Sequence, residues 1–396
     1  CLVVFFGEDY MPNNLLLKLF DPGITHLHRV GLAGLYMTLQ QLDPADYQEH
    51  GGWKLTDTSV EFFWNENPRN LLQPIIEKAF GISKVGVLDF FVHRKHRMSD
   101  LEKIQFHKAI LGTFLQHSRT RSLAKEAVQL SFEYDQKKIT IPLRPLKQYN
   151  NQKTNNIFNK KGELKKNIKL AGWAFPGGGV RHVGFSAPTT LTENVDRFLC
   201  LLFAPVGTLF FLISCKNQEG KFDQRKGAAI ILPHIKNLKN YERCYRKYLH
   251  SPVTQLYANS LGDAGLSALT VLNMKGSGGM LQELEIDSCS IVTQGDVPWN
   301  KQGKSRTTLE QIRTVNRARL AFFSFTSTTL EHKLVIKEDE SYYVQTSTAR
   351  GLIAGNIAAD RSWFPMLRMS LNLKTAATKM KVLPVNFPPM MHRSLS

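Results

Sequence analysis

The first clear hydrophobic pattern is a short apolar run, Leu15–Phe20, followed by a turn and then by apolar residues at helical spacing. Proline presets one backbone angle and glycine accepts a positive one, so Asp21-Pro22-Gly23 predicts a sharp turn. Beyond it, leucines recur every three or four residues beside small residues, which predicts a tightly packed helix over Arg29–Leu42. The pattern therefore predicts a strand, a turn and a packed helix, with a basic cluster presented at the turn by His26, His28 and Arg29.

Similar patterns along the rest of the chain predict an α+β protein with mixed or antiparallel sheets, packed helices, irregular basic loops and a more helical second half. Helices are predicted at Pro68–Phe80, Ser99–Gln116, Glu193–Phe203, Lys236–Leu249, Asp263–Asn273, Thr308–Ala321 and Thr348–Ala359. Strands are predicted at Lys169–Phe175, His182–Ala187, Thr208–Ser214, Ala228–Pro233, Leu281–Val292 and Lys333–Val344, and a hairpin at Val128–Tyr134 and Lys138–Ile141 around Asp135-Gln136.

The length of 396 residues allows two or three lobes. We predict an upstream extension at 1–10, an α+β body at 11–250 with a basic loop at 144–169, a helix-rich lobe at 251–366 and a basic, proline-containing tail at 367–396. We expect the extension and the tail to be poorly ordered. Met11 is a candidate start residue, and the ten residues before it lack the basic start of a signal peptide.

One apolar run, Phe198–Cys215, has 18 residues without a charge, which is the minimum length for a membrane span. Pro205 and Gly207 interrupt this run near its middle, and they predict a helix end and a turn into a strand. We therefore expect a buried core segment and no contact with a membrane.

The charge balance is unusual, although the 42% hydrophobic and 21% charged residues are those of an ordinary globular protein. Lys and Arg total 51 against 33 acidic residues, which gives a net charge of +18. Such a surplus repels itself in a compact monomer and favours a polyanionic partner. We therefore expect nucleic acid as the partner, with an anionic membrane surface as the second option.

The five cysteines are scattered along the chain and form no C-x-x-C pair. This pattern favours reduced thiols in a cytoplasmic protein over a disulfide framework or a structural zinc site. We expect no cofactor.

The segment Arg144–Lys169 is the first candidate binding surface. It contains eight basic residues and a single acid, Glu163, together with several asparagines. Lysines neutralise phosphates, and amide side chains both donate to and accept from base edges. The alternative is a solvated, flexible loop without a partner. The residues predicted to contact nucleic acid in this segment are Asn150, Asn151, Lys153, Lys160 and Lys161.

Glycine-rich loops are the second candidate. Consecutive glycines remove side chains, so that a backbone can approach a phosphate or enter a minor groove beside an inserted basic residue. The alternative is a tight hairpin turn. The residues predicted on this argument are Gly177, Gly178, Gly179, Arg181 and His182 in one loop, and Lys275 and Ser277 in another.

Two basic segments in the second half of the chain are further candidates. Lys301, Lys304 and Arg306 lead into the helix predicted at Thr308–Ala321 and are candidates for contact with a strand or guide backbone. Lys236–Lys247 interleaves five basic residues with three tyrosines, which suits either nucleic acid or a charged face against another subunit.

Catalytic and metal-binding patterns are weak. His93 and His96 are spaced for one helix face, but the cations beside them would repel a divalent ion, so we expect a structural or RNA-facing role. No phosphate-binding loop of the G-x-x-x-x-G-K-[ST] type occurs. We therefore expect neither a metal site nor ATP hydrolysis.

Four sequence blocks nevertheless resemble a known family. They are FDPGITHLHRVGLAGLYMTL at Phe20–Leu39, GWAFPGGGVRH at Gly172–His182, PWNKQGKSRTTLEQIRTVNRARLAFF at Pro298–Phe323 and STARGLIAGNIAADRSWF at Ser347–Phe364. In these blocks the chain resembles the large subunit of type I CRISPR effector complexes (Cascade), in the MYXAN variety. Family members continue into a helical bundle beyond this region, and we expect this chain to stop short of that bundle.

The resemblance implies a non-catalytic subunit in antiviral defence that binds the 5′ end of the CRISPR RNA and double-stranded target DNA. It implies recognition of the protospacer-adjacent motif and the start of R-loop formation. The implied partners are a Cas5-type subunit, the backbone and small subunits, and either a helicase–nuclease or a transposition adaptor.

Two other classes of function stay open on the sequence alone. The first is a metal-dependent nuclease that uses the same basic surface, with Asp89, Asp135 and Asp296 as its candidate acids. The second is a scaffold subunit that contacts only proteins.

Overall fold

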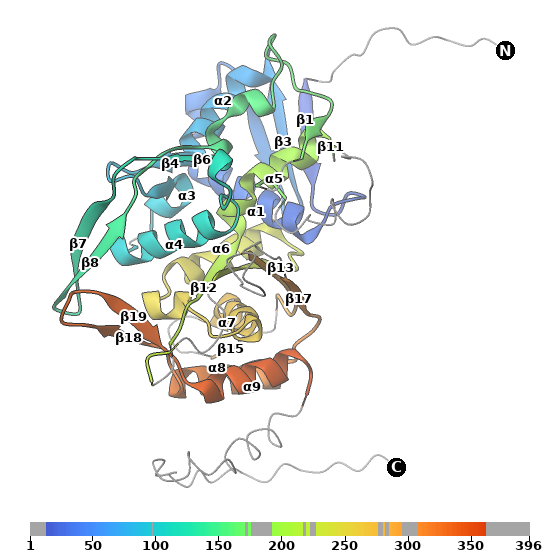
Figure 1. The fold of residues 1–396 in the computed structure, drawn as a ribbon. Helices are drawn as coiled ribbons and strands as arrows, with labels where there is room; N and C mark the ends of the chain where they lie inside the picture. Colours follow the sequence, from blue (N-terminus) through green and yellow to red (C-terminus); the bar gives the residue numbers. More distant parts are fainter. Residues whose placement is uncertain are drawn as a thin grey trace, which may run out of the picture.

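The computed structural model describes residues 13–96, 98–170, 173–175, 192–216, 219–221, 227–275, 280–281, 285–294 and 308–361. The helices in these ranges are α1 His26–Gln41, α2 Pro68–Ala79, α3 Phe91–Arg94, α4 Asp100–Gly112, α5 Val195–Gly207, α6 Leu238–Leu249, α7 Leu261–Asn273, α8 Arg317–Thr329 and α9 Thr348–Ala358. The fold is α+β, as the sequence predicts, and Figure 1 shows how the elements are arranged.

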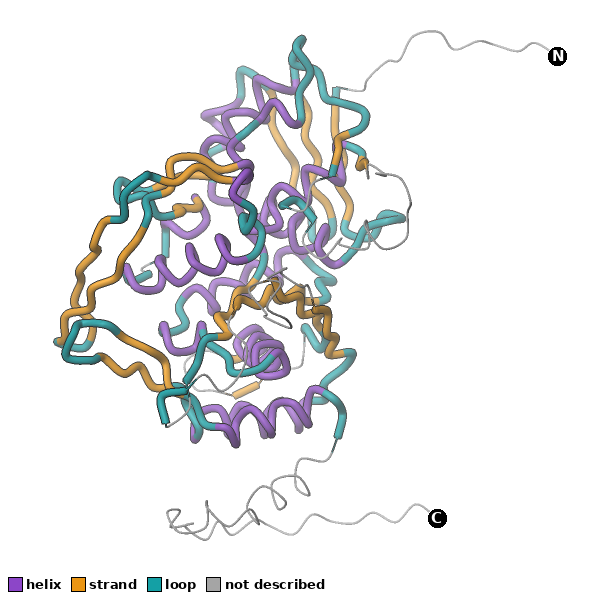
Figure 2. Tube along the Cα trace, in the orientation of Figure 1, coloured by secondary structure: helices purple, strands orange, loops and turns teal. Residues whose placement is uncertain are grey.

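The strands pair antiparallel in every ladder described (Figure 2). They are β1 Asn14–Lys18, β2 Gly51–Leu55, β3 Ser59–Trp64, β4 Phe80–Ile82, β5 Leu88–Phe90, β6 Arg121–Leu123, β7 Val128–Tyr134, β8 Lys137–Leu143, β9 Leu146–Tyr149, β10 Ile168–Lys169, β11 Thr192–Glu193, β12 Leu209–Ile213, β13 Gly227–Pro233, β14 Met274–Lys275, β15 Met280–Leu281, β16 Cys289–Gln294, β17 Thr308–Ile312, β18 Lys333–Ile336 and β19 Tyr342–Gln345. The larger sheets have the orders β1-β3-β2 and β12-β13-β16-β17.

The four-stranded sheet lies at the centre of the molecule between layers of helices (Figure 1). α7 packs on one side of it and is covered in turn by α8 and α9, while α1 and α4 contact β13. The sheet takes two strands from each side of residue 250. It therefore spans the boundary predicted there, and the domain division stays a prediction.

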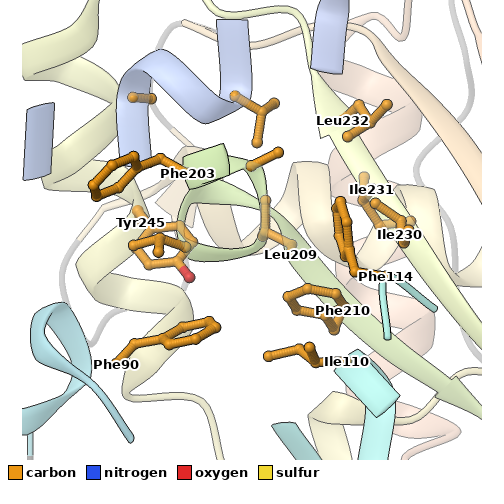
Figure 3. Close-up of a cluster of buried hydrophobic side chains, with 14 of the residues drawn as sticks. Phe90, Ile110, Phe114, Phe203, Leu209, Phe210, Ile230, Ile231, Leu232 and Tyr245 are labelled. Atoms are coloured by element: carbon orange, nitrogen blue, oxygen red, sulfur yellow. The ribbon is translucent and has the colours of Figure 1, made fainter. Parts of the chain in front are cut away.

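Aromatic side chains fill the core between the sheet and the N-terminal helices. Figure 3 shows Phe114 and Phe210 between Ile110 and Ile230, and the rings of the two phenylalanines meet edge to face with centroids 6.1 Å apart. Burying a side chain of this size contributes about 1.5–3 kcal/mol to the free energy of folding. This core fixes the position of α1, from which the candidate interface is built.

α1 and α5 cross at very close range because glycines face each other. A Cβ atom on Gly31 would lie 1.8 Å from the Cys200 carbonyl oxygen, and one on Gly207 would lie 2.1 Å from the Val30 carbonyl oxygen. The tight packing that the sequence predicts for this helix is therefore confirmed, and its partner is α5.

Some predictions of secondary structure are wrong. In the strand predicted at Lys169–Phe175, β10 ends at Lys169 and residues 173–175 form a turn. Thr308–Ile312 is the edge strand β17, paired with β16, and the helix begins only at Arg317. The helix end and the turn into a strand predicted at Pro205 and Gly207 are confirmed, although α5 continues past the predicted Phe203 to Gly207 before β12 begins at Leu209. Just beyond the helix, Thr208 donates from its backbone N–H and its hydroxyl to the Ala204 carbonyl.

Two hairpins far apart in sequence join at one side of the molecule (Figure 1). In β7–β8, the turn at Asp135-Gln136 is confirmed, and both of its residues have positive φ. Lys138 of this hairpin lies 2.8 Å from the Glu340 carboxylate in the β18–β19 hairpin.

The cysteines agree with the predicted reduced thiols in the part of the chain that the structure describes. There Cys200, Cys215, Cys244 and Cys289 are buried and form no disulfide with one another. A search of the same residues for a helix both long enough and apolar enough to cross a membrane finds none.

Candidate nucleic-acid interface

The basic segment at residues 144–169, here called the lysine loop, is folded against the body of the protein. Its apolar residues Ile157, Phe158, Leu164 and Ile168 are buried. Because these anchors fix the backbone, the lysines between them stand on an ordered surface. The exposed cations of the loop are Arg144, Lys147, Lys160, Lys161, Lys166 and Lys169.

The tip of the lysine loop is a hydrogen-bonded turn. The Asn159 side-chain oxygen accepts from the backbone N–H groups of Lys161 and Glu163, at 2.8 and 3.0 Å. Gly162 has a φ of +87°, a value that glycine adopts at little cost. Outside the loop, the Asn67 side chain donates to the Lys161 carbonyl at 3.1 Å. The turn therefore holds the Lys160 and Lys161 side chains toward solvent.

The acid of the lysine loop is occupied within the same turn. Glu163 accepts a 2.7 Å hydrogen bond from the Asn159 side-chain amide. Among the described residues, its carboxylate therefore forms no ion pair with the exposed lysines at the tip of the loop. A solvent-facing group of like charges on a rigid turn attracts a polyanion and contributes little to folding stability.

The amide side chains of the loop differ from their predicted role. Asn151 is 1% exposed and its side chain donates to the Leu202 carbonyl in α5 at 2.8 Å, so the prediction of a direct nucleic-acid contact is wrong for this residue. Buried carbonyl groups need hydrogen-bond donors, and Asn151 is a donor for the Leu202 carbonyl in the last part of α5. Asn150 and Lys153 bind each other at 2.9 Å, and their nucleic-acid contact stays a prediction.

The predicted loop of Gly177, Gly178, Gly179, Arg181 and His182 lies outside the described residues, but the residues on either side of it have defined positions. The Phe175 ring lies 6.1 Å from the His28 ring, and the Glu193 carboxylate lies 3.6 Å from His28 Nε2. Both flanks of the loop are therefore fixed beside the start of α1. Of the remaining predicted residues, Lys275 ends β14, whereas Ser277, Lys301, Lys304 and Arg306 are also outside the described ranges.

The basic cluster predicted at the start of α1 is divided between two roles. His28 is 2% exposed, and its Nδ1 accepts from the Thr25 backbone N–H at 3.2 Å, which closes the first turn of the helix. Burial, and after it the charge of Arg197, lowers the pKa of His28 to about 4, so the ring is neutral at pH 7. The expectation of a basic surface residue is therefore wrong for His28, whereas His26 and Arg29 keep partial exposure.

Sequence reasoning missed His234, which stacks on the ring of His26 with centroids 5.1 Å apart. The two residues are distant in the chain, and β13 alone brings His234 to this place. His234 directly follows the apolar strand β13, and a polar residue at that place marks the end of a strand. This position was the only sign of His234 in the sequence.

The tyrosines of α6 belong to the core. Tyr241 donates to the Gly207 carbonyl at 2.6 Å, and Tyr248 donates to the Phe210 carbonyl at 2.7 Å. Their spacing by three and four residues, which matches one helix face, was the signal for burial. The nucleic-acid alternative for these tyrosines is therefore wrong. The two arginines of α6 pair with acids, Arg243 with Glu285 at 2.6 Å and Arg246 with Glu242 at 2.8 Å.

The histidines near α3 line a cavity of about 190 Å³ together with Asp89, Arg94 and Lys103. Burial, and then the charge of His96, lowers the pKa of His93 to about 3. Among the described residues, no group of three or more His, Cys, Asp or Glu side chains could hold a metal ion. Of the nuclease candidates, Asp89 pairs with Arg94 at 2.9 Å, Asp135 lies in the β7–β8 turn, and Asp296 is not in the described ranges.

Comparisons with known proteins agree with the sequence blocks. Residues 16–202 match the family model of the DevT N-terminal domain, a region that contains the start of α1 and the whole lysine loop. Over 376 residues the chain is 24% identical to the CRISPR-associated protein Cas8a1/Csx13 of Myxococcus xanthus (strain DK1622). This alignment covers 89% of the chain and 63% of that relative, so the chain spans less than two thirds of the relative's length. The resemblance to a Cas8-type CRISPR-associated protein is therefore confirmed, and residues 16–202 are similar to the DevT N-terminal domain.

Proposed function

We propose that this protein is a non-catalytic large subunit of an RNA-guided DNA-targeting complex of the Cascade type. In this role it recognises the protospacer-adjacent motif and binds the 5′ end of the CRISPR RNA and the target DNA as the R-loop starts. The observation that carries the proposal is the lysine loop, an ordered group of exposed cations inside the region that matches the DevT N-terminal domain.

The physical requirements of such a subunit agree with these features. Guide pairing supplies the sequence specificity, so the protein needs a basic surface for backbones and a small element that reads the adjacent motif. Lys160 and Lys161 supply the first requirement. The segment between Phe175 and Thr192, which contains the predicted reader Arg181, supplies the second in this proposal.

Binding of the assembled complex to target duplexes tests the proposal. Guide-loaded complexes are titrated with duplexes whose flanking three base pairs are varied, at two salt concentrations. We expect Lys160→Glu/Lys161→Glu to weaken binding to every duplex, because phosphate contacts carry no sequence information. Arg181→Ala should instead flatten the preference among flanks.

A charge reversal far from the loop, Lys333→Glu in β18, is the matched control and should leave both properties unchanged. If the wild-type complex binds all flanks equally, the proposed recognition of the motif is wrong. If the double variant behaves like Lys333→Glu, the lysine loop is not the interface.

The proposal that the subunit is non-catalytic has a separate test. Incubation of the full chain with DNA and either Mg²⁺ or Mn²⁺ should give no cleavage. Cleavage that is lost in Asp89→Asn or Asp135→Asn would support the nuclease instead. The partners in this proposal are a Cas5-type subunit, the backbone and small subunits, and either a helicase–nuclease or a transposition adaptor.

A further inference from the structure

Partly exposed basic and aromatic side chains meet at the start of α1, at a place that the proposed interface has not used. Arg29 lies over the Phe20 ring at 5.1 Å, and His26 stacks on His234. His26 Nδ1 is 3.0 Å from the hydroxyl of Ser290 in β16. These residues, together with Lys236, are here called the α1 niche. The niche joins α1 to the ends of β13 and β16.

The Arg29 guanidinium is the least satisfied group in the niche. Its Nε is buried and has no hydrogen-bond partner among the residues that the structure describes. A buried donor without an acceptor is costly in a folded protein. Arg29 as a whole is partly exposed, and a phosphate beside its guanidinium would form charge-assisted hydrogen bonds. The nearby acid Asp287 is directed to Lys236, at 3.8 Å, and it also acts on His234.

The electrostatics of the niche also favour an anion. Burial lowers the pKa of His26, and the charges of His234 and Arg29 lower it further. Burial likewise lowers the pKa of His234, with Arg29 and Lys236 acting in the same direction and Asp287 opposing them. The first turn of α1 contains no acid, and the positive end of the helix dipole points here. A bound phosphate would stabilise the positive charges of Arg29 and Lys236, and it would favour the protonated forms of the two histidines.

We propose that the α1 niche binds a phosphate of a nucleic-acid strand, held by Arg29, His26, His234 and Lys236, with a neighbouring base against Phe20. Phe20 is 54% exposed, and an exposed aromatic ring beside a guanidinium is suited to base stacking. This inference rests on the proposed function and adds a second, separate contact to it.

Hydrogen bonds and ion pairs connect the niche to the lysine loop. Lys169, at the end of the loop, pairs with Thr192 in the β10–β11 ladder. The adjoining Glu193 binds Arg197 at 2.8 Å, and Arg197 donates to the Pro22 carbonyl at 3.5 Å, just before the niche. These contacts fix the end of the lysine loop relative to the turn that precedes α1.

The test measures binding of a fluorescent single-stranded oligonucleotide to the full chain by anisotropy. Arg29→Gln should weaken binding about tenfold, which is the effect of losing one charge-assisted contact. The slope of log affinity against log salt concentration should become less steep by about the contribution of one phosphate contact. Lys333→Gln removes the same charge from β18 and is the matched control. Because cations oppose the dipole at this helix end, Arg29→Gln should melt no lower than wild type. Equal affinities of the two variants would overturn the proposal.

A pH series tests the two histidines separately from Arg29. A bound phosphate favours their protonated forms, so the affinity should rise as the pH falls from about 8 to about 5. His26→Asn/His234→Asn should lose most of this rise, while Lys333→Gln should keep it. A rise of equal size in all variants would mean that the titrating groups are elsewhere, which would overturn the role of the histidines.

Competition with inorganic phosphate tests whether the niche binds the phosphate of a nucleic-acid strand or a free phosphate ion. Under the proposal, phosphate competes only weakly with the oligonucleotide. Strong competition at about millimolar phosphate that is lost in Arg29→Gln would overturn the strand as the ligand. Flank-dependent binding by the assembled complex is measured in parallel, so failure of the niche and failure of the proposed function give different results.

Discussion

At the scale of single residues, the best-defined polar cluster is the buried pair of Asp263 and Arg350. Arg350 Nε donates to the Asp263 carboxylate at 2.9 Å, and both side chains are nearly inaccessible. Burial by itself would raise the pKa of Asp263, but Arg350, followed by His332, lowers it well below its usual range. Burial lowers the pKa of His332, so at neutral pH the ion pair is formed with Arg350.

Asp263→Asn should lower the free energy of unfolding by about 3–5 kcal/mol, because Arg350 keeps a buried charge without its partner. Because its pKa is lowered, Asp263 stays ionised at pH values at which an ordinary carboxyl group is protonated. Its contribution is therefore fully present above the unfolded pKa, about 3.9, and is lost only as the pH falls through the lower folded value. The free energies of unfolding of variant and wild type, measured with urea, should differ by a constant amount from about pH 8 to about pH 5.

The exposed Glu126 provides the control for this prediction. Glu126→Gln should change the free energy of unfolding by less than about 0.5 kcal/mol. A gap for Asp263→Asn that disappears already at about pH 6 would contradict the lowered pKa of Asp263.

The crossing of α1 and α5 gives a second prediction at residue scale. A Cβ atom on Gly34 would lie 2.5 Å from the Phe203 carbonyl oxygen and 2.8 Å from the Gly207 nitrogen, both of which are backbone atoms. Gly34→Val must therefore separate the helices, at a cost of about 1–3 kcal/mol or more. Gly355→Ala in α9 meets nothing within 4 Å, so it should instead stabilise by about 0.4–1 kcal/mol. Equal and small effects in denaturant unfolding would argue against the close crossing.

At the scale of elements, the β7–β8 hairpin has an imperfect turn. Asp135 and Gln136 have φ values of +50° and +58°, and this turn geometry favours Asn-Gly or Asp-Gly. Gln136→Gly should raise the free energy of unfolding by about 1 kcal/mol, since the left-handed conformation costs a side chain about that amount. Gln129→Gly in the middle of β7 should lower stability by about 0.5–1 kcal/mol. If Gln136→Gly destabilises as much as Gln129→Gly, the turn assignment is wrong.

Elements with strong local signals are the ones that the sequence predicts well. α4 begins where Ser99 and Glu102 form a capping box, and α2 begins at Pro68 behind the capping residue Asn67. Thr307 and Glu310 also have the spacing of a capping box, yet Thr308–Ile312 becomes a strand because β16 offers it an edge. Pairing between distant segments, which local pattern does not contain, decides this case.

The same distinction holds for the candidate interface. The charge of the lysine loop is visible in the sequence, but the burial of Asn151 depends on α5, which comes some fifty residues later. His26 was predicted as part of a basic cluster, whereas its neighbour His234 could be found only after β13 had brought it to α1. Composition thus predicts the partner class, and the fold decides which side chains face it.

At the scale of the whole molecule, some surface cations pair with acids and others do not. On α6 the cations Arg243 and Arg246 are paired with acids, whereas Lys160 and Lys161 at the tip of the lysine loop have no acidic partner within the described ranges. Unpaired surface cations gain most from a polyanion, because binding releases condensed counterions without breaking an existing ion pair. A net charge of +18 should therefore act through the loop and the α1 niche rather than through the whole surface.

Hydrogen exchange of the full chain, with and without a DNA duplex at low salt, tests this uneven use of charge. Amides in two segments, residues 157–169 and 20–30, should become protected together, because Glu193 and Arg197 connect the end of the loop to Pro22. The β18–β19 hairpin, which lies away from both segments, should exchange unchanged (Figure 1). The protection should disappear at about 0.5 M salt, where the Debye length falls to a few ångström. Protection of residues 333–345 equal to that of the loop would show that the charge acts over the whole surface and that neither segment is a defined interface.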